Sequence, residues 1–493
     1  MTDRLQRLYP SRTSRALHCR DISHPTSLPH PTSLTDPSAN VHARPCTGGR
    51  MSPLICCFRK RASYRFALLI AALLTMQPAV SSAFASDEVL DWMQITNDTA
   101  LSSSITVANP VLTGRLLALV SASMFDAVNG IDPRYRPYHV RPDAPRHASK
   151  RAAAVEAAYE ILVLFYPTLE PSLTAQRDAS IAALTDSPTA IKEGMNWGQS
   201  VADAIWNWRL TDGFNPPPPP PFFGVQSIAG TPASVGAWRP TPPLNAPGAV
   251  PQLATITPWV LKRPSQFRVP PPYALTSAQY ATDYNEIKVM GVYSGSGRTQ
   301  DQSDLVIFWN GNPPLIWVRI ALQLAANHGL TLAENAHLFA LMDLAMADGF
   351  VAVWDAKYRY GFWRPITAIQ NGDADGNAAT DPNPTWTPWL DSNGGTPSHP
   401  EYPSAHAVVS GAIAYVLAST FGDDTPFTAT SNIFPGTRSF SSFSSALAEI
   451  ADARVFGGIH FRTSCEIGND LGRSVGNYVL THALRPQDDD HNR

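Results

Sequence analysis

Apolar residues recur with a spacing near 3.6 after residue 85, which is the periodicity of an α-helix that buries one face. In the segment 111–128, Leu112, Leu116 and Val120 fall on the same broad face. Ser or Thr caps and first-turn prolines mark the starts of further helices. The expected helices cover residues 111–128, 152–166, 172–184, 187–208, 280–290, 302–309, 315–327, 331–354 and the apolar run after residue 406. No segment keeps the alternation of a long strand, so we expect an all-α fold with at most a few short hairpins.

A Pro-rich stretch interrupts this helical pattern at residues 214–275 and contains six consecutive prolines at positions 216–221. Such a composition is typical of extended backbone in a long excursion or a linker between lobes. We therefore expect two packed helical-bundle lobes joined by the Pro-rich segment. The N-terminal lobe covers residues 86–213 and the C-terminal lobe covers residues 276–485.

The N-terminal region has the pattern of an export signal. Four basic residues between positions 59 and 65 precede the apolar run 66–76, which is too short to span a bilayer. Ala83 and Ala85 stand at positions −3 and −1 of a cleavage before Ser86. We interpret residues 51–85 as a signal peptide and predict a secreted or periplasmic protein. A retained N-terminal anchor is the alternative, but we expect no stable membrane span in the mature chain.

Residues 1–50 are rich in Pro, Ser and Arg without hydrophobic periodicity. We interpret them as disordered or as an over-long start, with Met51 as the true initiator, and exclude them from the fold.

Composition narrows the class of protein further. The chain has 493 residues, of which 44% are hydrophobic and 16% charged, so it can bury a sizeable core. A net charge of only −3 argues against nucleic-acid binding, which requires an excess of basic residues on at least one domain. Only Cys465 of the five cysteines follows residue 85, which excludes an intramolecular disulfide and a cysteine-based metal site in the mature chain.

Three separated segments in the C-terminal half concentrate basic and imidazole side chains beside small residues. They are Lys357 with Arg364-Pro365, then Pro403-Ser404-Ala405-His406, then Arg454 with His460. If the three cations converged in a helical core, their repulsion and desolvation would be costly without an anion. Arginine and lysine side chains together with a helix N-terminus can bind the oxygens of a phosphate-sized oxyanion. The segments therefore predict an oxyanion site with two histidines available for chemistry.

These segments resemble the signature of the superfamily that joins vanadium haloperoxidases to type 2 phosphatidic acid phosphatases. Its three motifs are K-x6-RP, PSGH and SR-x5-H-x3-D. Here 37 residues separate Pro365 from Pro403, and 47 separate His406 from Arg454, as in that superfamily. We identify the chain as similar to the vanadium-dependent haloperoxidases, which implies a vanadate cofactor, with hydrogen peroxide, a halide and a small organic acceptor as partners.

The resemblance also implies a role for each matching residue. His460 would be the vanadate ligand, and His406 would be the catalytic acid/base. Lys357, Arg364 and Arg454 would neutralise the vanadate oxygens, with Lys357 also contributing to catalysis, while Ser404 and the Ala405 amide would donate hydrogen bonds. Trp354 and His399 would form the halide and peroxide environment, and the imidazole of His399 favours bromide and iodide over chloride.

The chain departs from the motifs at three positions. Ala405 replaces a glycine, Ala453 replaces a serine, and Ser464 stands where the closing Asp belongs. Because that acid commonly orients the histidine ligand, its role must be taken over elsewhere or be lost. Three aspartates lie on the expected helix before Lys357 and are equally suited to structural roles: Asp343, Asp348 and Asp355.

Two other functions remain open from the sequence. A secreted acid phosphatase of the same superfamily would use His460 as a nucleophile that forms a phosphohistidine. An exported binding protein with a relict site would be expected to have lost some of the charged positions, all of which are present. Trp354 and the aromatic residues around the first motif favour the haloperoxidase.

Overall fold

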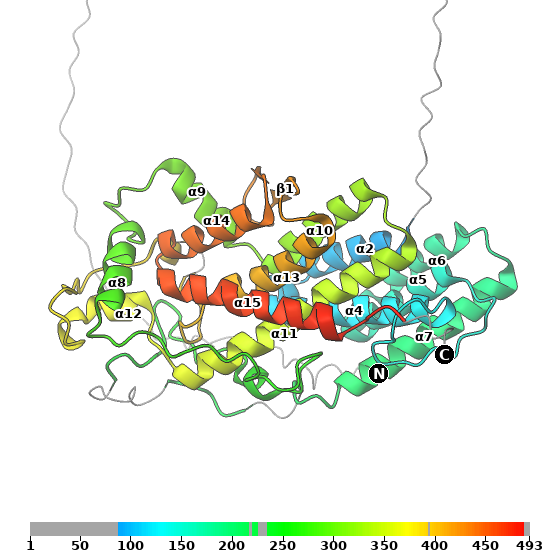
Figure 1. Cartoon of the computed structure of the whole chain (residues 1–493), viewed down its shortest axis with the longest axis horizontal. Coiled ribbons are helices and arrows are strands. Elements are labelled where there is room, and N and C mark those ends of the chain that lie inside the picture. The colour runs from blue at the N-terminus through cyan, green and yellow to red at the C-terminus, as the bar shows by residue number, and fades with distance from the viewer. Residues whose placement is uncertain (1–86, 216–218, 225–233, 393–394, 488–493) are drawn as a thin grey trace, which may run out of the picture. The chain divides into compact units, whose positions relative to one another are not determined.

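A computed structural model describes residues 87–215, 219–224, 234–392 and 395–487. Within these ranges the chain forms fourteen α-helices and a single antiparallel hairpin (Figure 1). The strands are β1 (Phe427–Thr430) and β2 (Thr437–Phe440), paired with Phe427 opposite Phe440. The all-α fold class is confirmed. The predicted signal peptide and residues 1–50 lie outside the described residues, and the proposed lobe boundaries stay a prediction.

Most helices begin close to where the caps and prolines predicted them. The first group is α2 (Glu88–Ser102), α3 (Ser104–Val107), α4 (Pro110–Ile131), α5 (Lys150–Phe165), α6 (Glu170–Ala182) and α7 (Pro188–Arg209). The second is α8 (Ala278–Met290), α9 (Gln300–Trp309), α10 (Pro313–His328), α11 (Leu332–Tyr360), α12 (Pro365–Gln370), α13 (Ala405–Phe421), α14 (Phe443–Phe456) and α15 (Arg462–His482). The predicted capping box of Thr331 and Glu334 opens α11.

The long helix α11 lies at the centre of the core. It packs against α4 on one side and against α13 and α15 on another (Figure 1). Its side chains are buried almost continuously from Asn335 to Lys357, which explains why its sequence is apolar on all faces. This rigid helix carries Lys357 near its C-terminal end.

Two helices, α4 and α11, are long and apolar enough to cross a membrane by length and composition. The expectation that the mature chain has no membrane span is therefore not supported by these criteria. In the structure the same helices lie inside the protein, with 100% and 94% of their most apolar windows buried.

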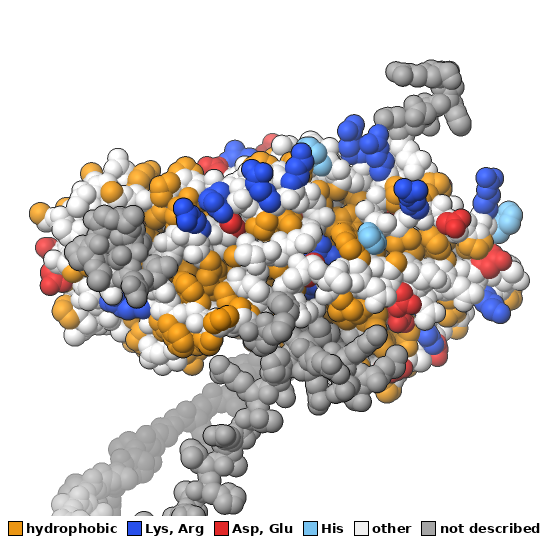
Figure 2. All heavy atoms as spheres, turned by 90° about the horizontal axis from the view of Figure 1, so that it is seen from below, with side chains coloured by type: hydrophobic (Ala, Val, Ile, Leu, Met, Phe, Trp, Pro, Cys, Tyr) orange, Lys and Arg blue, Asp and Glu red, His pale blue; other side chains and the backbone are white. Residues whose placement is uncertain are grey.

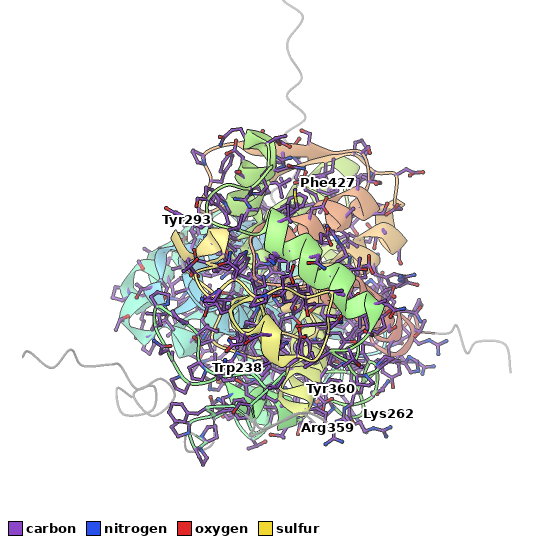
Figure 3. The ribbon with its side chains drawn as sticks, turned by 90° about the vertical axis from the view of Figure 1, so that its left-hand side faces the viewer. Trp238, Lys262, Tyr293, Arg359, Tyr360 and Phe427 are labelled. Atoms are coloured by element: carbon purple, nitrogen blue, oxygen red, sulfur yellow. The ribbon has the colours of Figure 1, made fainter. Side chains whose placement is uncertain are left out.

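The Pro-rich segment packs tightly against α11 where the structure describes it. The Asp348 carboxylate of α11 accepts hydrogen bonds from three consecutive backbone N–H groups, those of Trp259, Val260 and Leu261, each at 2.7 Å. At the other end of the helix, Tyr360 donates to the carbonyl of Val269 at 2.6 Å, near Trp238 in Figure 3. This segment is thus part of the packed core rather than only a spacer.

Charged side chains of both signs lie among apolar and other uncharged groups on the face shown in Figure 2. The buried charges of the three motif segments are a separate population, because Lys357, Arg364 and Arg454 are each 0% exposed. These buried cations mark the region that requires a functional explanation.

Candidate active site

The three motif segments meet because each one lies at a helix end that faces the same interior point. Lys357 lies in the last turn of α11, which ends at Gly361 in the left-handed conformation (φ 55°). This turn reverses the chain so that Arg364 becomes the N-cap residue of α12. Ser404 is the N-cap residue of α13, and Arg454 lies in the last turn of α14.

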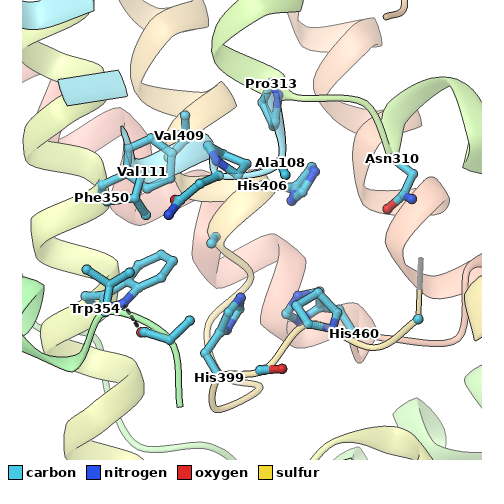
Figure 4. A pocket seen from close by; sticks show the side chains of 18 residues that line it. Ala108, Val111, Asn310, Pro313, Phe350, Trp354, His399, His406, Val409 and His460 are labelled. Carbon is cyan, nitrogen blue, oxygen red and sulfur yellow. Dashed lines mark hydrogen bonds between the residues drawn. The ribbon is translucent and has the colours of Figure 1, made fainter. Parts of the chain in front are cut away.

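A cavity of about 370 Å³ opens at this point. Its walls include the imidazoles of His399, His406 and His460, which surround the same space in Figure 4. Apolar side chains form much of the remaining wall; among them are Val111, Pro313, Phe350, Trp354 and Val409. The volume lies within the range of small-molecule binding sites and exceeds what a single oxyanion needs.

The Pro-rich segment contributes Ala249 and Val250 to the wall of the cavity. The carbonyl of Ala249 accepts hydrogen bonds from Trp354 Nε1 at 3.1 Å and from the Tyr358 hydroxyl at 2.6 Å. Val250 adopts a φ of 49°, which is rare for a β-branched residue and is maintained here by these anchors.

Arg364 connects the histidine-bearing loops to each other. Its Nη1 donates to the Ile459 carbonyl at 2.8 Å and lies 3.2 Å from His460 Nε2. Its Nη2 lies 3.0 Å from His399 Nδ1, and its Nε donates to the His399 carbonyl at 3.0 Å. The guanidinium therefore holds both imidazoles at the cavity while its charge stays buried beside them.

Several donors around this point have no hydrogen-bond partner within the described part of the chain. Arg454 makes a single long contact, from Nη1 to the Trp309 carbonyl at 3.5 Å, and its Nε and Nη2 are unpaired. Ser404 is an N-cap residue whose side chain does not cap its helix. Its Oγ contacts the Cys465 thiol, a weak hydrogen-bonding group, and has no other partner among the described residues. Such buried donors are rare unless a ligand completes them.

The N-terminus of α13 adds further donors. Backbone N–H groups in the first turn of a helix have no partner within the helix, and Ala405, its first residue, lines the cavity. Ala405 has an ordinary helical conformation, so a Cβ is accepted where the motif has glycine. A guanidinium, a hydroxyl and a helix N-terminus together are the donors that suit a tetrahedral oxyanion.

Lys357 approaches from the opposite side. Its Nζ donates to the carbonyls of Pro400 and Glu401, both at 2.9 Å, which leaves one N–H available. Burial, and then the charge of Arg364, lower the pKa of the Lys357 ammonium well below its usual value. A bound anion would offset both effects and favour the charged form.

All three cavity histidines are held neutral. Burial is the main cause that lowers the pKa of His406 well below 6.5, followed by the charge of Arg454. A hydrogen bond with the backbone of Gly311 engages the His406 ring, and its Nε2 has no partner among the described residues. Burial and the charge of Arg364 lower the pKa of His460 in the same way.

Glu401 is the site residue that the sequence analysis missed. Its Oε1 accepts hydrogen bonds from His460 Nδ1 at 2.8 Å and from the Phe461 N–H at 3.1 Å, and the side chain is fully buried. None of the three aspartates considered from sequence contacts His460 in these interactions. Asp348 binds the Pro-rich backbone, Asp355 pairs with Arg268, and Asp343 is buried beside Ser121. The only available signal was that an acid lies five residues before His406.

The structure thus brings all nine predicted site residues into one region. Five of them line the cavity: Trp354, His399, Ala405, His406 and His460. The other four, Lys357, Arg364, Ser404 and Arg454, lie behind this lining and are buried. His399 contacts Arg364, and its ring centroid lies 5.1 Å from that of Trp354, so this side chain is held in place at the cavity. Their assigned roles stay predictions.

Comparison with known proteins points to one family. A family model described as the VCPO second helical-bundle domain matches residues 337–489. The solved structure of the first bacterial vanadium-dependent iodoperoxidase is 27% identical, with a TM-score of 0.69 over 81% of this chain and 98% of that one. These matches support assigning the chain to the vanadium haloperoxidase family.

Two further relatives extend this picture. The vanadium chloroperoxidase of Curvularia inaequalis is 24% identical over 196 residues, which is 32% of this chain and 32% of that protein. A holo-type bacterial vanadium-dependent chloroperoxidase shares the fold, with a TM-score of 0.61 at 19% identity over 78% of this chain and 96% of that one. The curated relative is therefore matched over only about a third of its length. The matched family domain contains all three motif segments, from Lys357 to His460.

Proposed function

We propose that this protein is a vanadate-dependent haloperoxidase that oxidises bromide and iodide with hydrogen peroxide to hypohalous acid, which then halogenates a small organic acceptor. The observation that carries this proposal is the set of unpaired buried donors. Arg454 and Ser404 supply such groups: the charge of Arg454 acts on His406 and His460, and Ser404 is the N-cap residue of α13. An oxyanion with a coordination position for one imidazole matches this donor set.

The residues that would hold vanadate follow from the contacts. His460 lines the cavity and its Nδ1 is engaged by Glu401, so Nε2, which here lies 3.2 Å from Arg364 Nη1, would be the ligand. Arg454, Ser404 and the Ala405 amide would donate to the oxygens, and Lys357 would supply its remaining N–H. Arg364 uses its donors mainly within the protein and would add charge and keep His460 in position. Bound vanadate would supply a Lewis acid that activates hydrogen peroxide without a change of oxidation state.

His406 is suited to move the proton in this reaction. Its ring is neutral and its Nε2 has no partner in the described chain, so this atom can accept a proton from hydrogen peroxide as it enters the cavity. The same atom can return the proton to the leaving oxygen. Because Arg454 opposes a positive charge on the ring, the proton would be held only briefly.

His399 supports the preference for bromide and iodide. Its ring lines the cavity between Trp354 and Arg364, and it makes the approach to the oxyanion site more polar than an aromatic side chain would. Chloride oxidation is the most demanding of the three reactions. A second imidazole that competes for protons is expected to disfavour it.

One assay tests the proposed activity. Protein freed of bound anions should brominate phenol red with hydrogen peroxide only after vanadate is added, and phosphate should compete with vanadate. An Arg454→Met variant should lose most of this activity at limiting vanadate. The matched change Arg319→Met, in a half-buried residue of α10 outside the cavity wall, should not. Hydrolysis of phosphomonoesters without vanadate, inhibited by adding it, would instead establish the phosphatase alternative.

We also propose that the protein is exported to a secreted or periplasmic location. The basic cluster, the short apolar run and the small residues before Ser86 support this, and α2 begins only two residues later, at Glu88. N-terminal sequencing of the mature protein should give Ser86 as the first residue. A mature protein that retains residues 51–85 would contradict the proposal.

A further inference from the structure

Glu401 combines two contacts that no other carboxylate in the described residues makes. Its backbone carbonyl accepts a hydrogen bond from Lys357 Nζ at 2.9 Å, and its carboxylate accepts one from His460 Nδ1 at 2.8 Å. The residue is itself fixed, because its N–H donates to the Phe362 carbonyl at 2.9 Å. A single residue therefore sets the position of a site cation and of a site imidazole.

The contacts at the two ring nitrogens determine the tautomer of His460. Arg364 Nη1 can only donate and lies 3.2 Å from Nε2, so Nε2 accepts with its lone pair and Nδ1 carries the proton. Burial raises the pKa of Glu401 to about 7, and its ionised form accepts the hydrogen bond from Nδ1. The Phe461 N–H also donates to Glu401 Oε1, which prevents the carboxylate from rotating away. The ring is thereby kept ready to coordinate through Nε2.

The region behind this pair has room for a different arrangement. Glu401 and Ser464 both line a second, small cavity of about 20 Å³. The Ser464 hydroxyl lies close enough to the Glu401 carboxylate to lower its pKa as a hydrogen-bonding neighbour. Glu401 Oε2 and Ser464 Oγ have no other partner among the described atoms, and the cavity volume holds about one water molecule. A longer acidic side chain at position 464 would extend into this space towards the same region of the site.

We propose, resting on the proposed function, that Glu401 is the positioning residue that fixes His460 as the Nδ1–H tautomer for the oxyanion, and that it takes the place of the acid absent at Ser464. The carboxylate function has moved from the helix after the histidine to the loop before α13. The small cavity beside Ser464 is the space that the shorter side chain leaves.

The proposal is tested by removing the carboxylate at position 401 and introducing one at position 464. We expect Glu401→Gln to weaken vanadate binding to the apoprotein by about 10- to 100-fold, as is usual when the partner of a ligating histidine is changed. The double variant Glu401→Gln/Ser464→Asp should recover most of this loss, whereas Ser464→Asp alone should bind vanadate as the unmodified protein does. Isothermal titration calorimetry without peroxide or halide measures these affinities. Glu156→Gln, which changes another buried glutamate far away in α5, is the matched control and should have no effect on them.

A second measurement separates positioning from simple stability. ¹⁵N NMR of the His460 ring in the apoprotein should show a protonated Nδ1, and this preference should weaken in Glu401→Gln and return in the double variant. Unchanged vanadate affinity and tautomer in Glu401→Gln, or a loss of affinity that Ser464→Asp does not restore, would overturn the proposal. Unmodified protein that binds no vanadate would refute the proposed cofactor, while the tautomer measurement would still test Glu401 by itself.

Discussion

Two clusters of buried cationic side chains in this protein differ in how their positive charge is compensated. In the first cluster, Arg115 of α4 and Arg209 of α7 share the carboxylate of Asp212, with N–O distances of 2.7 and 2.6 Å. Backbone carbonyls accept further donors of both guanidiniums, and the Trp259 ring lies 3.9 Å from Arg209 Cζ. Arg209 Nε is the one fully buried donor of this cluster that lacks a partner among the described residues.

The second cluster contains more positive charge and fewer partners. Lys357, Arg364 and Arg454 are all fully buried, yet among the residues that the structure describes only the carboxylate of Glu401 interacts closely with them, and it is engaged by His460. Two nitrogens of Arg454 remain unpaired. Buried charges are paired when they only support the fold, whereas buried charges that lack a partner indicate a ligand that supplies one.

The largest expected effect comes from breaking the paired cluster. Asp212→Ala leaves two buried guanidiniums without their carboxylate, and we expect it to lower the free energy of unfolding by about 3–5 kcal/mol. Urea denaturation of the apoprotein measures this change. Asp470→Ala, which removes an exposed partner of Arg473, should cost less than about 1 kcal/mol. Equal effects of the two variants would show that the buried Asp212 pair contributes no more to stability than an exposed ion pair does.

The opposite result is expected in the second cluster. Arg454→Met replaces an incompletely paired buried charge by an apolar side chain of similar size, so the apoprotein should be as stable as before or more stable. The same variant loses charge-assisted hydrogen bonds to the oxyanion, and vanadate should bind about 100-fold more weakly, or about 2.7 kcal/mol. If Arg454→Met unfolded as easily as Asp212→Ala and still bound vanadate normally, Arg454 would support the fold rather than bind the anion.

A smaller effect should appear when the ligand itself is supplied. Vanadate at ten times its dissociation constant should stabilise the unmodified protein by about 1.4 kcal/mol through binding linkage. For a chain of this size the melting temperature should rise by about 1–2 °C. Differential scanning calorimetry with and without vanadate measures the shift, which should vanish in Arg454→Met at the same concentration. A similar shift in both proteins would place the anion elsewhere.

Apolar periodicity in the sequence predicted the helices that bury one face of large apolar residues. It did not predict the helices that pack partly through small residues. Helix α15 has Gly468, Gly472 and Gly476 along the side that faces α13. A Cβ at these positions would meet the side chains or backbone of α13, so the close approach of the two helices depends on these glycines as well as on the buried Leu471, Val475 and Val479. Periodicity of large apolar residues does not detect the glycine part of such an interface. Helix α14 was not expected either, although it buries an apolar face.

For the site, the sequence supplied the residues and the structure supplied their partners. The motif spacing was enough to select the cations and both histidines. It could not reveal Glu401, because the link to His460 joins residues 59 positions apart and depends on how the loop before α13 folds. The Pro-rich composition gave no indication that Asp348 would bind the backbone of that segment or that Val250 would line the cavity.

The smallest effect concerns halide choice. His399→Phe removes the nitrogen that lies 3.0 Å from Arg364 Nη2 and replaces a neutral, polar ring by an apolar one beside Trp354. We expect the unmodified enzyme to oxidise bromide and iodide with little chloride activity. The variant should raise the ratio of chloride to bromide rates by up to about tenfold, or about 1.4 kcal/mol. Steady-state rates with each halide near pH 6 measure the ratio, and His337→Phe, at a half-buried histidine stacked on Tyr135 near the start of α11, is the control. Robust chloride oxidation by the unmodified enzyme, or a ratio that His399→Phe leaves unchanged, would show that this imidazole does not govern the choice of halide.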